Sequence, residues 1–308
     1  MRRSLVLDFD GSVAGRADAV VVPLQARQDG VRFGCSLREL HALIDPLDAQ
    51  LGPAPGVVFL GSGDFHHVSL PLIQRAARRA PLEVVVLDNH PDNMRWLGGI
   101  HCGSWVRHVA RLATVTHVHV LGITSADISA SRLWENYFSP LWRGRLTYWS
   151  VGRPPTWLHR LARLAAFRNF DSPAALCDAF ARQQEGATTP VYLSIDKDVL
   201  SPQLVTCNWD QGCFEESHVL HVLSALQGRI AGCDITGEIS AHEYSTWWKR
   251  WAASLDAQPV VDPQALERHQ LEHDQLNARL QSRILAAMLP KAASDPACAP
   301  PSMRPVPV

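Results

Sequence analysis

The sequence is short of net charge and of long apolar runs, and each shortage excludes a class of protein. The 308 residues carry a net charge of -1, so nothing draws the chain to nucleic acid or to an anionic membrane surface. No apolar run is long enough to span a bilayer. The basic start Met1-Arg2-Arg3 is soon followed by Asp8 and Asp10, which makes a poor secretion signal. We therefore expect no nucleic-acid partner and no membrane partner.

The sequence also lacks paired cysteines. Its seven cysteines are scattered without a C-x-x-C pair, and an odd number at irregular spacings does not suggest a disulfide framework. A reducing cytoplasm fits this usage best. The hydrophobic fraction of 46% is ample for a core, and the length could hold one large α/β domain or two small ones.

What the chain does have is an alternation of short apolar runs and amphipathic segments. The runs typical of buried strands cover residues 4–8, 19–24, 57–60, 84–87, 117–121, 146–150, 190–195 and 229–235. The segments expected as helices cover residues 36–47, 158–167, 173–183 and 215–226. This order predicts a three-layer α/β/α domain with a mainly parallel sheet of about eight strands.

The chain changes character near its C-terminal end. We expect the α/β domain over residues 1–255, a helical appendage over 256–289 and a disordered, proline-rich tail over 290–308. Asp262-Pro263 is a typical helix start. The helix that follows has a partial apolar stripe, which packs either on the domain or on a partner, so a homo-oligomer stays open.

The most informative stretch follows the run at 84–87. Asp88, His90 and Asp92 stand at alternate positions, and the period of two in an extended chain turns all three side chains to one face. Carboxylates and an imidazole that converge in this way favour a site for a divalent cation. The alternative is a polar loop in which Asp92 caps the next helix.

Two further strand ends repeat this arrangement. The run at 190–195 is followed by Asp196 and Asp198, and two more carboxylates aimed at one place are costly unless cations neutralise them. The alternative is an acidic turn balanced by Lys197. The run at 57–60 ends in a glycine-rich turn with two adjacent histidines, of which we choose His66 over His67 as the ligand.

Three more positions complete the candidate site. His101 could shuttle protons because histidine titrates near neutral pH; a loop histidine that caps a helix is an equal alternative. Glu238 is a carboxylate just past the last strand, and Trp209 and Asp210 lie in a polar loop before a helix. In a parallel sheet the ligand site lies outside the carboxyl ends of the strands, where all these motifs fall. Six ligands are too many for one small cation and suit two metals that share carboxylates.

Taken in order, these motifs resemble those of the arginase/agmatinase (ureohydrolase) family, within the arginase–deacetylase superfamily. The likeness covers roughly residues 1–250 and rests on Gly61–His66, Asp88-Asn89-His90-Pro91-Asp92, Ser194–Asp198 and Glu238. It implies an arginase-like fold and hydrolysis of a C–N bond in a guanidino, amidino or related small molecule.

The resemblance also implies a role for each residue. One Mn²⁺ would be bound by His66, Asp88, Asp92 and Asp196, and a second by Asp88, His90, Asp196 and Asp198, with other divalent ions remaining open. His101 would be the proton shuttle, Asp92 would orient the attacking hydroxide, and Glu238 would hold the cationic group of the substrate. Trp209 and Asp210 would contact the remainder of that substrate.

Departures from the family pattern leave alternatives open. Asn89 replaces a small residue, and Ser201 stands where the family has an aspartate before proline. An amide deacetylase of the same superfamily and a non-catalytic relative therefore stay open. So does a phosphatase, because Asp8-Phe9-Asp10-Gly11-Ser12 resembles the nucleophile motif of the haloacid-dehalogenase family.

Overall fold

The computed structural model describes residues 2–14, 18–153, 166–247, 249–250 and 262–290. Its centre is a nine-stranded sheet in the order β2-β1-β4-β11-β10-β5-β7-β8-β9, and every pairing between neighbours is parallel. The expected three-layer α/β architecture is confirmed, with nine strands where about eight were expected.

The strands match the apolar runs closely. Their bounds are β1 Ser4–Asp8, β2 Ala19–Pro23, β4 Val57–Phe59, β5 Leu82–Leu87, β7 Val115–Ile123, β8 Leu146–Val151, β9 Phe167–Phe170, β10 Val191–Asp196 and β11 Ile230–Thr236. The extra strand is β9, a four-residue edge strand with Arg168 and Asn169 at its centre, too short and too polar to give a strand pattern. The helix expected over 158–167 lies almost wholly outside the described residues, and its last residue begins β9.

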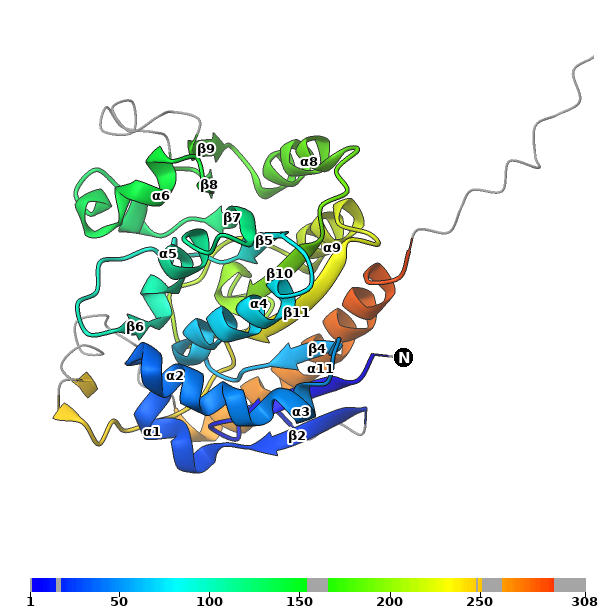
Figure 1. Ribbon diagram of the computed structural model, residues 1–308. Coiled ribbons are helices and arrows are strands. Elements are labelled where there is room, and N and C mark those ends of the chain that lie inside the picture. Colours follow the sequence, from blue (N-terminus) through cyan, green and yellow to red (C-terminus); the bar gives the residue numbers. More distant parts are fainter. Residues whose placement is uncertain (1, 15–17, 154–165, 248, 251–261, 291–308) are drawn as a thin grey trace, which may run out of the picture.

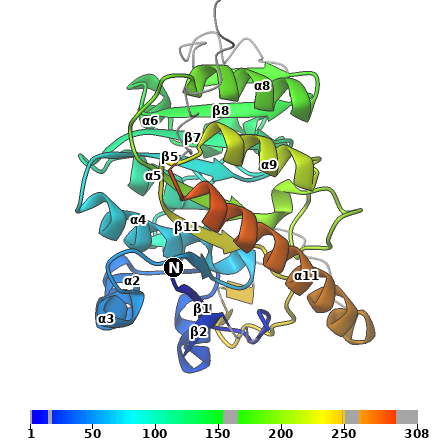
Figure 2. The ribbon, with the colours of Figure 1, turned by 90° about the vertical axis from the view of Figure 1, so that its right-hand side faces the viewer.

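Helices cover both faces of the sheet (Figure 1). One face carries α1 Gln28–Val31, α2 Leu37–Ile44, α3 Asp48–Leu51, α4 Ser69–Ala77 and α5 Trp105–Ala110, with the short α6 Phe138–Trp142 nearby. The other face carries α8 Pro173–Gln184, α9 Glu216–Ala225 and α11 Pro263–Ala287 (Figure 2). Each face has its own hydrophobic core, so both sides of the sheet are buried, as a parallel sheet requires.

The long helix α11 is part of the second core. Asp262 caps its first turn by accepting from the backbone N–H of Gln264, and Pro263 follows at the first helical position. Leu276, Leu280 and Ile284 are fully buried and pack with residues of β10, β11 and α9. The apolar stripe therefore packs on the domain itself. None of the helices in the described ranges is long and apolar enough to cross a membrane.

The topology brings the polar motifs together. Because all strands are parallel, their carboxyl ends lie at the same end of the sheet. β4, β11, β10 and β5 are consecutive neighbours, so the polar segments that follow them meet.

A small antiparallel ribbon of β3 (Gly34–Cys35) and β6 (Ile100–His101) pairs Gly34 with His101. A Cβ on Gly34 would lie 2.7 Å from that of His101, so a larger residue would displace this histidine.

Candidate metal centre

His66 faces three carboxylates that come from two different strand ends. Its Nδ1 lies 3.3 Å from Oδ2 of Asp88, 3.1 Å from Oδ2 of Asp92 and 3.2 Å from Oδ2 of Asp196. All four residues are buried. His66 Nδ1 and Asp88 Oδ2 have no hydrogen-bond partner among the described residues. Buried polar atoms left unsatisfied are costly, and these two atoms together with Oδ2 of Asp92 and of Asp196 form a donor set that fits a divalent cation.

A second group shares Asp88. His90 Nδ1 lies 2.8 Å from Oδ2 of Asp198 and 3.6 Å from Oδ1 of Asp88. Asp88 therefore presents Oδ2 to the first group and Oδ1 to the second, which is the arrangement of a bridging carboxylate. In each of the two groups, His66–Asp88–Asp196 and Asp88–His90–Asp198, the donor atoms lie within 4.8 Å of one another.

The shifted pKa values of the candidate ligands result from an excess of buried negative charge. Burial raises the pKa of Asp92 to about 7, and the charge of Asp88 adds to the rise. Burial and the charge of Asp196 hold the pKa of Asp198 well above its usual range. Burial lowers the pKa of His66, but the nearby carboxylates of Asp196, Asp88 and Asp92 outweigh it and raise the pKa well above the ordinary value. Carboxylates crowded in this way are typical of cation sites.

The far side of the His66 ring is held by a buried relay. Its Nε2 lies 3.0 Å from the hydroxyl of Ser194, and that hydroxyl donates to Asp234 Oδ1 at 2.6 Å. Tyr192 donates to the other oxygen of Asp234 at 2.8 Å. Sequence reasoning did not include Asp234 in the site. The available signal was the period of two, because Ser194 and Asp196 share one face of β10.

Asp92 sits in a strained backbone conformation. Its φ is +45°, which is costly for a residue other than glycine and is found where a site requires it. The indole N–H of Trp105 donates to its Oδ2 at 2.7 Å, and the Trp105 ring lies 4.7 Å from the ring of His66. No helix begins between Asp92 and Cys102, so the alternative role of Asp92 as a helix cap is not supported.

His101 both caps a turn and lines the cavity. Its Nδ1 accepts from the backbone N–H of Gly103 at 3.0 Å, at the start of the 3-10 turn Cys102–Ser104. The ring stacks on Phe33 with centroids 5.8 Å apart and meets Trp96 edge-on at 4.4 Å. Burial lowers the pKa of His101 to about 3, so the ring is neutral and its proton sits on Nε2.

The candidate ligands other than Asp88 line one cavity of about 470 Å³. The lining that they do not supply comes from Phe33, Gly63, Met94, His101, Cys102, Gly103, Asp127, Arg132, Glu135, Trp209 and Asp210. Asp210 accepts from His90 Nε2 at 2.6 Å and from the side-chain amide of Asn89 at 3.2 Å. Trp209 and Asp210 therefore lie beside the centre, as expected of the loop before α9.

Glu238 lies elsewhere. Its side chain is fully buried and is absent from the described cavity lining. Lys197 Nζ and Asn277 Nδ2 both donate to its Oε1, the latter at 2.8 Å. Burial raises its pKa, but Lys197 and then His273 lower it to about 2 overall. The structure thus does not bring Glu238 to the cavity, and Lys197 balances Glu238 rather than Asp196 or Asp198.

The N-terminal acidic motif forms a separate network. Asp10 accepts from Ser12 Oγ at 2.6 Å and pairs with Arg32 at 3.4 Å. Arg32 also binds Asp64 at 2.7 Å, and Asp64 belongs to the turn that carries His66. Asp8 accepts from the backbone N–H of Gly11 at 2.8 Å and joins neither metal group in the described residues. This strand end supports the neighbouring turn.

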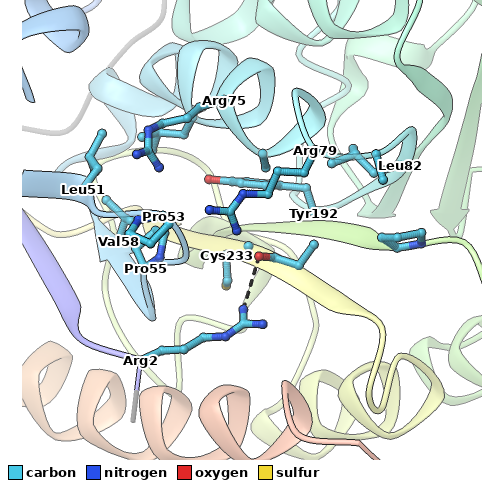
Figure 3. A pocket seen from close by; sticks show the side chains of 16 residues that line it. Arg2, Leu51, Pro53, Pro55, Val58, Arg75, Arg79, Leu82, Tyr192 and Cys233 are labelled. Atoms are coloured by element: carbon cyan, nitrogen blue, oxygen red, sulfur yellow. Dashed lines mark hydrogen bonds between the residues drawn. The ribbon is translucent and has the colours of Figure 1, made fainter. Parts of the chain in front are cut away.

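The molecule has a second cavity at the other end of the sheet, away from the carboxyl ends of the strands. It measures about 190 Å³ and lies at the amino ends of β4, β5, β10 and β11. Figure 3 shows three guanidinium groups, from Arg2, Arg75 and Arg79, around an apolar floor that includes Tyr192 and Cys233. Arg75 is paired with Asp48, and Arg2 donates to the carbonyl of Ala231 at 3.2 Å. None of the candidate site residues lines this cavity.

Comparison with known proteins identifies the fold. No family model matches the sequence. Over 222 residues, which are 72% of this chain and 71% of the other, it is 28% identical to an uncharacterized protein of Thermotoga maritima.

Three solved structures share the architecture. The proclavaminate amidino hydrolase of Streptomyces clavuligerus superposes with a TM-score of 0.53 at 17% identity, over 92% of this chain and 91% of that one. The arginase of Medicago truncatula also gives 0.53 at 17% identity, over 88% and 72%. The formimidoylglutamase of Bacillus subtilis gives 0.51 at 12% identity, over 93% and 86%. The resemblance to the ureohydrolase family is confirmed in the fold, which is arginase-like.

Proposed function

We propose that this arginase-like chain is a metal-dependent hydrolase that cleaves a C–N bond in a small molecule with a guanidino, amidino or related group. One observation carries the proposal. His66 Nδ1 lies within 3.3 Å of three carboxylate oxygens, and it has no hydrogen-bond partner in the described structure. A fold alone does not specify chemistry. The proposal therefore depends on this convergence of donor atoms around His66.

The donor set favours two divalent ions of the Mn²⁺ type. His66, Asp88, Asp92 and Asp196 would hold one ion, and Asp88, His90, Asp196 and Asp198 the other. All the donors are carboxylate oxygens or imidazole nitrogens, and no thiolate joins them, which suits Mn²⁺ better than zinc. When bound, such ions would lower the pKa of water, so that hydroxide is available near neutral pH.

The side chains around the ions have separate tasks. Asp92, held by the indole of Trp105, orients the attacking group. His101 is neutral and carries its proton on Nε2, because Nδ1 accepts from Gly103. It would take up at Nδ1, in place of that bond, the proton that the attacking water loses, and the imidazolium would then pass its Nε2 proton to the departing nitrogen. Both residues line the cavity.

Asp210 and Trp209, rather than Glu238, are the proposed contacts of a cationic substrate. Glu238 is engaged by Lys197 and Asn277. Hydrogen bonding from His90 lowers the pKa of Asp210, so its carboxylate is charged, and it lines the cavity together with the Trp209 ring. A planar cation can stack on an indole while it pairs with an adjacent carboxylate.

The compartment that we propose is the cytoplasm. The six cysteines in the described part of the chain, Cys35, Cys102, Cys177, Cys207, Cys213 and Cys233, are all free thiols. Unpaired cysteines fit a reducing environment.

The decisive experiment combines metal analysis with a substrate panel. Protein purified without chelator should contain more than one equivalent of divalent metal. With Mn²⁺ added, it should release urea, ammonia or amine from at least one guanidino, formimino or acetylated amine compound.

The outcomes separate the rival functions. Turnover of acetylated amines alone would favour a deacetylase. Metal binding without turnover across the panel would favour a non-catalytic relative. Phosphate-ester hydrolysis that is lost in Asp8→Asn would favour the phosphatase and overturn the proposal.

A further inference from the structure

Lys197 is a buried cation placed directly between two candidate metal ligands. It follows Asp196 and precedes Asp198, and its side chain is 0% exposed. It does not line the cavity. Its Nζ donates to Oε1 of Glu238 and to Oδ1 of Asn277, the latter at 3.1 Å. A buried ammonium is tolerated only when such partners surround it, so this contact fixes where the 196–198 turn can lie.

Glu238, the partner of Lys197, also contacts the turn that carries His66. Its backbone N–H donates to the carbonyl of Gly61 at 3.1 Å, and its residue forms a parallel bridge with Ser62. The pair of Lys197 and Glu238 therefore joins the segment after β10 to the segments after β11 and β4. Two of these three segments carry candidate ligands.

Asn277, a residue of α11, contacts both members of this ion pair. Its side-chain oxygen accepts from Lys197 at 3.1 Å, and its side-chain nitrogen donates to Glu238 at 2.8 Å. It is fully buried, and both halves of its amide are used. The helix itself is fixed to the sheet by Leu276 and Leu280 on either side of this residue.

We infer that Lys197, Glu238 and Asn277 form a brace that holds the Asp196–Asp198 turn in its metal-binding position from behind, and that α11 thereby supports a centre it does not touch. The three are positioning residues, and the inference rests on the proposed metal centre. Residues behind metal ligands commonly change metal affinity 10- to 100-fold when they are replaced.

The test compares two buried amides on one helix. Asn277→Ala removes the contact of α11 with Lys197 and one of its two contacts with Glu238, and it leaves the contact of His273 Nδ1 with Glu238 Oε2 at 3.1 Å. Gln281→Ala is the matched control, because Gln281 lies one turn further along, is equally buried and donates instead to Asp18 at 2.7 Å. Mn²⁺ affinity of the folded full-length chain is measured by isothermal titration, and the unfolding midpoint is measured separately in the presence of chelator.

The expected result is an Mn²⁺ affinity about 10- to 100-fold weaker in Asn277→Ala, with the affinity of Gln281→Ala unchanged. Equal affinity losses in the two variants, or none in Asn277→Ala, overturn the inference. If Asn277→Ala does not fold, Asn277→Ser keeps a polar contact and is judged by the same criterion. Failure of the unsubstituted chain to bind Mn²⁺ overturns the proposed function and this inference together, whereas binding that survives Asn277→Ala overturns this inference alone.

Discussion

His66 and Ser194 are joined by a hydrogen bond of 3.0 Å between Nε2 and Oγ, and this bond fixes the tautomer of the imidazole. The one hydroxyl proton of Ser194 goes to Asp234, so Ser194 must accept from His66. A ring proton therefore sits on Nε2, and Nδ1, which faces the three carboxylates, is left to hold either the second proton of the metal-free site or a cation. Hydrogen-bond direction assigns this tautomer, and it is the form that a metal ligand needs.

The relay behind His66 gives a first prediction. Asp234→Asn keeps the size of the side chain but removes its charge, so the imidazole becomes a weaker ligand. We expect Mn²⁺ affinity to fall about 10- to 100-fold. Nitrogen-15 NMR of the histidines should show a loss of the pure Nε2–H tautomer. Tyr192→Phe is the control, since it leaves the bond from Ser194 to Asp234 intact and should change affinity little.

Asp196 provides the most direct test of the metal centre. Its Oδ2 lies 3.2 Å from His66 Nδ1, and the carboxylate belongs to the first donor group. Asp196→Asn should therefore lose most of the bound metal, measured by elemental analysis after gel filtration. Asp127→Asn replaces a cavity carboxylate that pairs with Arg132 and should keep the metal. Equal metal content in both variants would contradict the assigned centre.

Two buried histidines predict how stability depends on pH. Burial lowers the pKa of His67 and of His101 to about 3 in the folded chain, below the unfolded value of about 6.5. Between these values the unfolded state binds more protons, so stability is full above about pH 6.5 and falls as the pH decreases toward 3. Each histidine should contribute about 1.4 kcal/mol of loss per pH unit in that window.

The measurement is urea unfolding at pH 7.5 and 5.0, followed by circular dichroism. His101→Gln removes one of the two groups and should flatten the dependence. A slope identical to that of the unsubstituted chain would show that His101 is already accessible to protons in the folded state.

Substitutions of Glu238 and Asp210 are expected to have different effects. The first should change stability, and the second should change substrate binding. Glu238→Gln leaves the buried Lys197 without its charged partner, which should cost about 3–5 kcal/mol of unfolding free energy and leave KM unchanged when Mn²⁺ is saturating. Asp210→Asn retains an acceptor for His90 but loses the charge. It should raise KM for a cationic substrate about tenfold, which corresponds to about 1.4 kcal/mol, with stability unaffected. The reverse pattern would restore Glu238 to the substrate site.

The fold and the ligand cluster could be predicted because both depend on local alternation. Apolar runs specified the strands, and parallel topology placed the residues after Leu60, Leu87 and Ile195 at one edge. The choice of His66 over His67 followed from resemblance. In the structure, His66 turns Nδ1 to the carboxylates, while His67 is buried against Cys35 at 3.9 Å.

The partners of Glu238 could not be predicted, because they come from distant parts of the chain. Sequence shows Lys197 beside two aspartates and suggests that it balances them. Lys197, however, begins the 3-10 turn Lys197–Val199, and its side chain meets Asn277, 80 residues away. The same holds for Arg32, which reaches Asp64 and Ser240. Contacts of this range depend on the packing of α11 and the loops and leave no periodic signal.

The position of β5 and β10 in the sheet has a consequence for how ions would exchange at the proposed metal centre. These strands pair with each other and have a further strand on either side, so their amide hydrogens belong to the most slowly exchanging part of the molecule. Local opening at the edges of the sheet leaves Asp88 and Asp196 in place. If the proposed centre holds ions, they would leave through the mouth of the cavity, and the loops there, rather than local opening of the sheet, would set their rate of release.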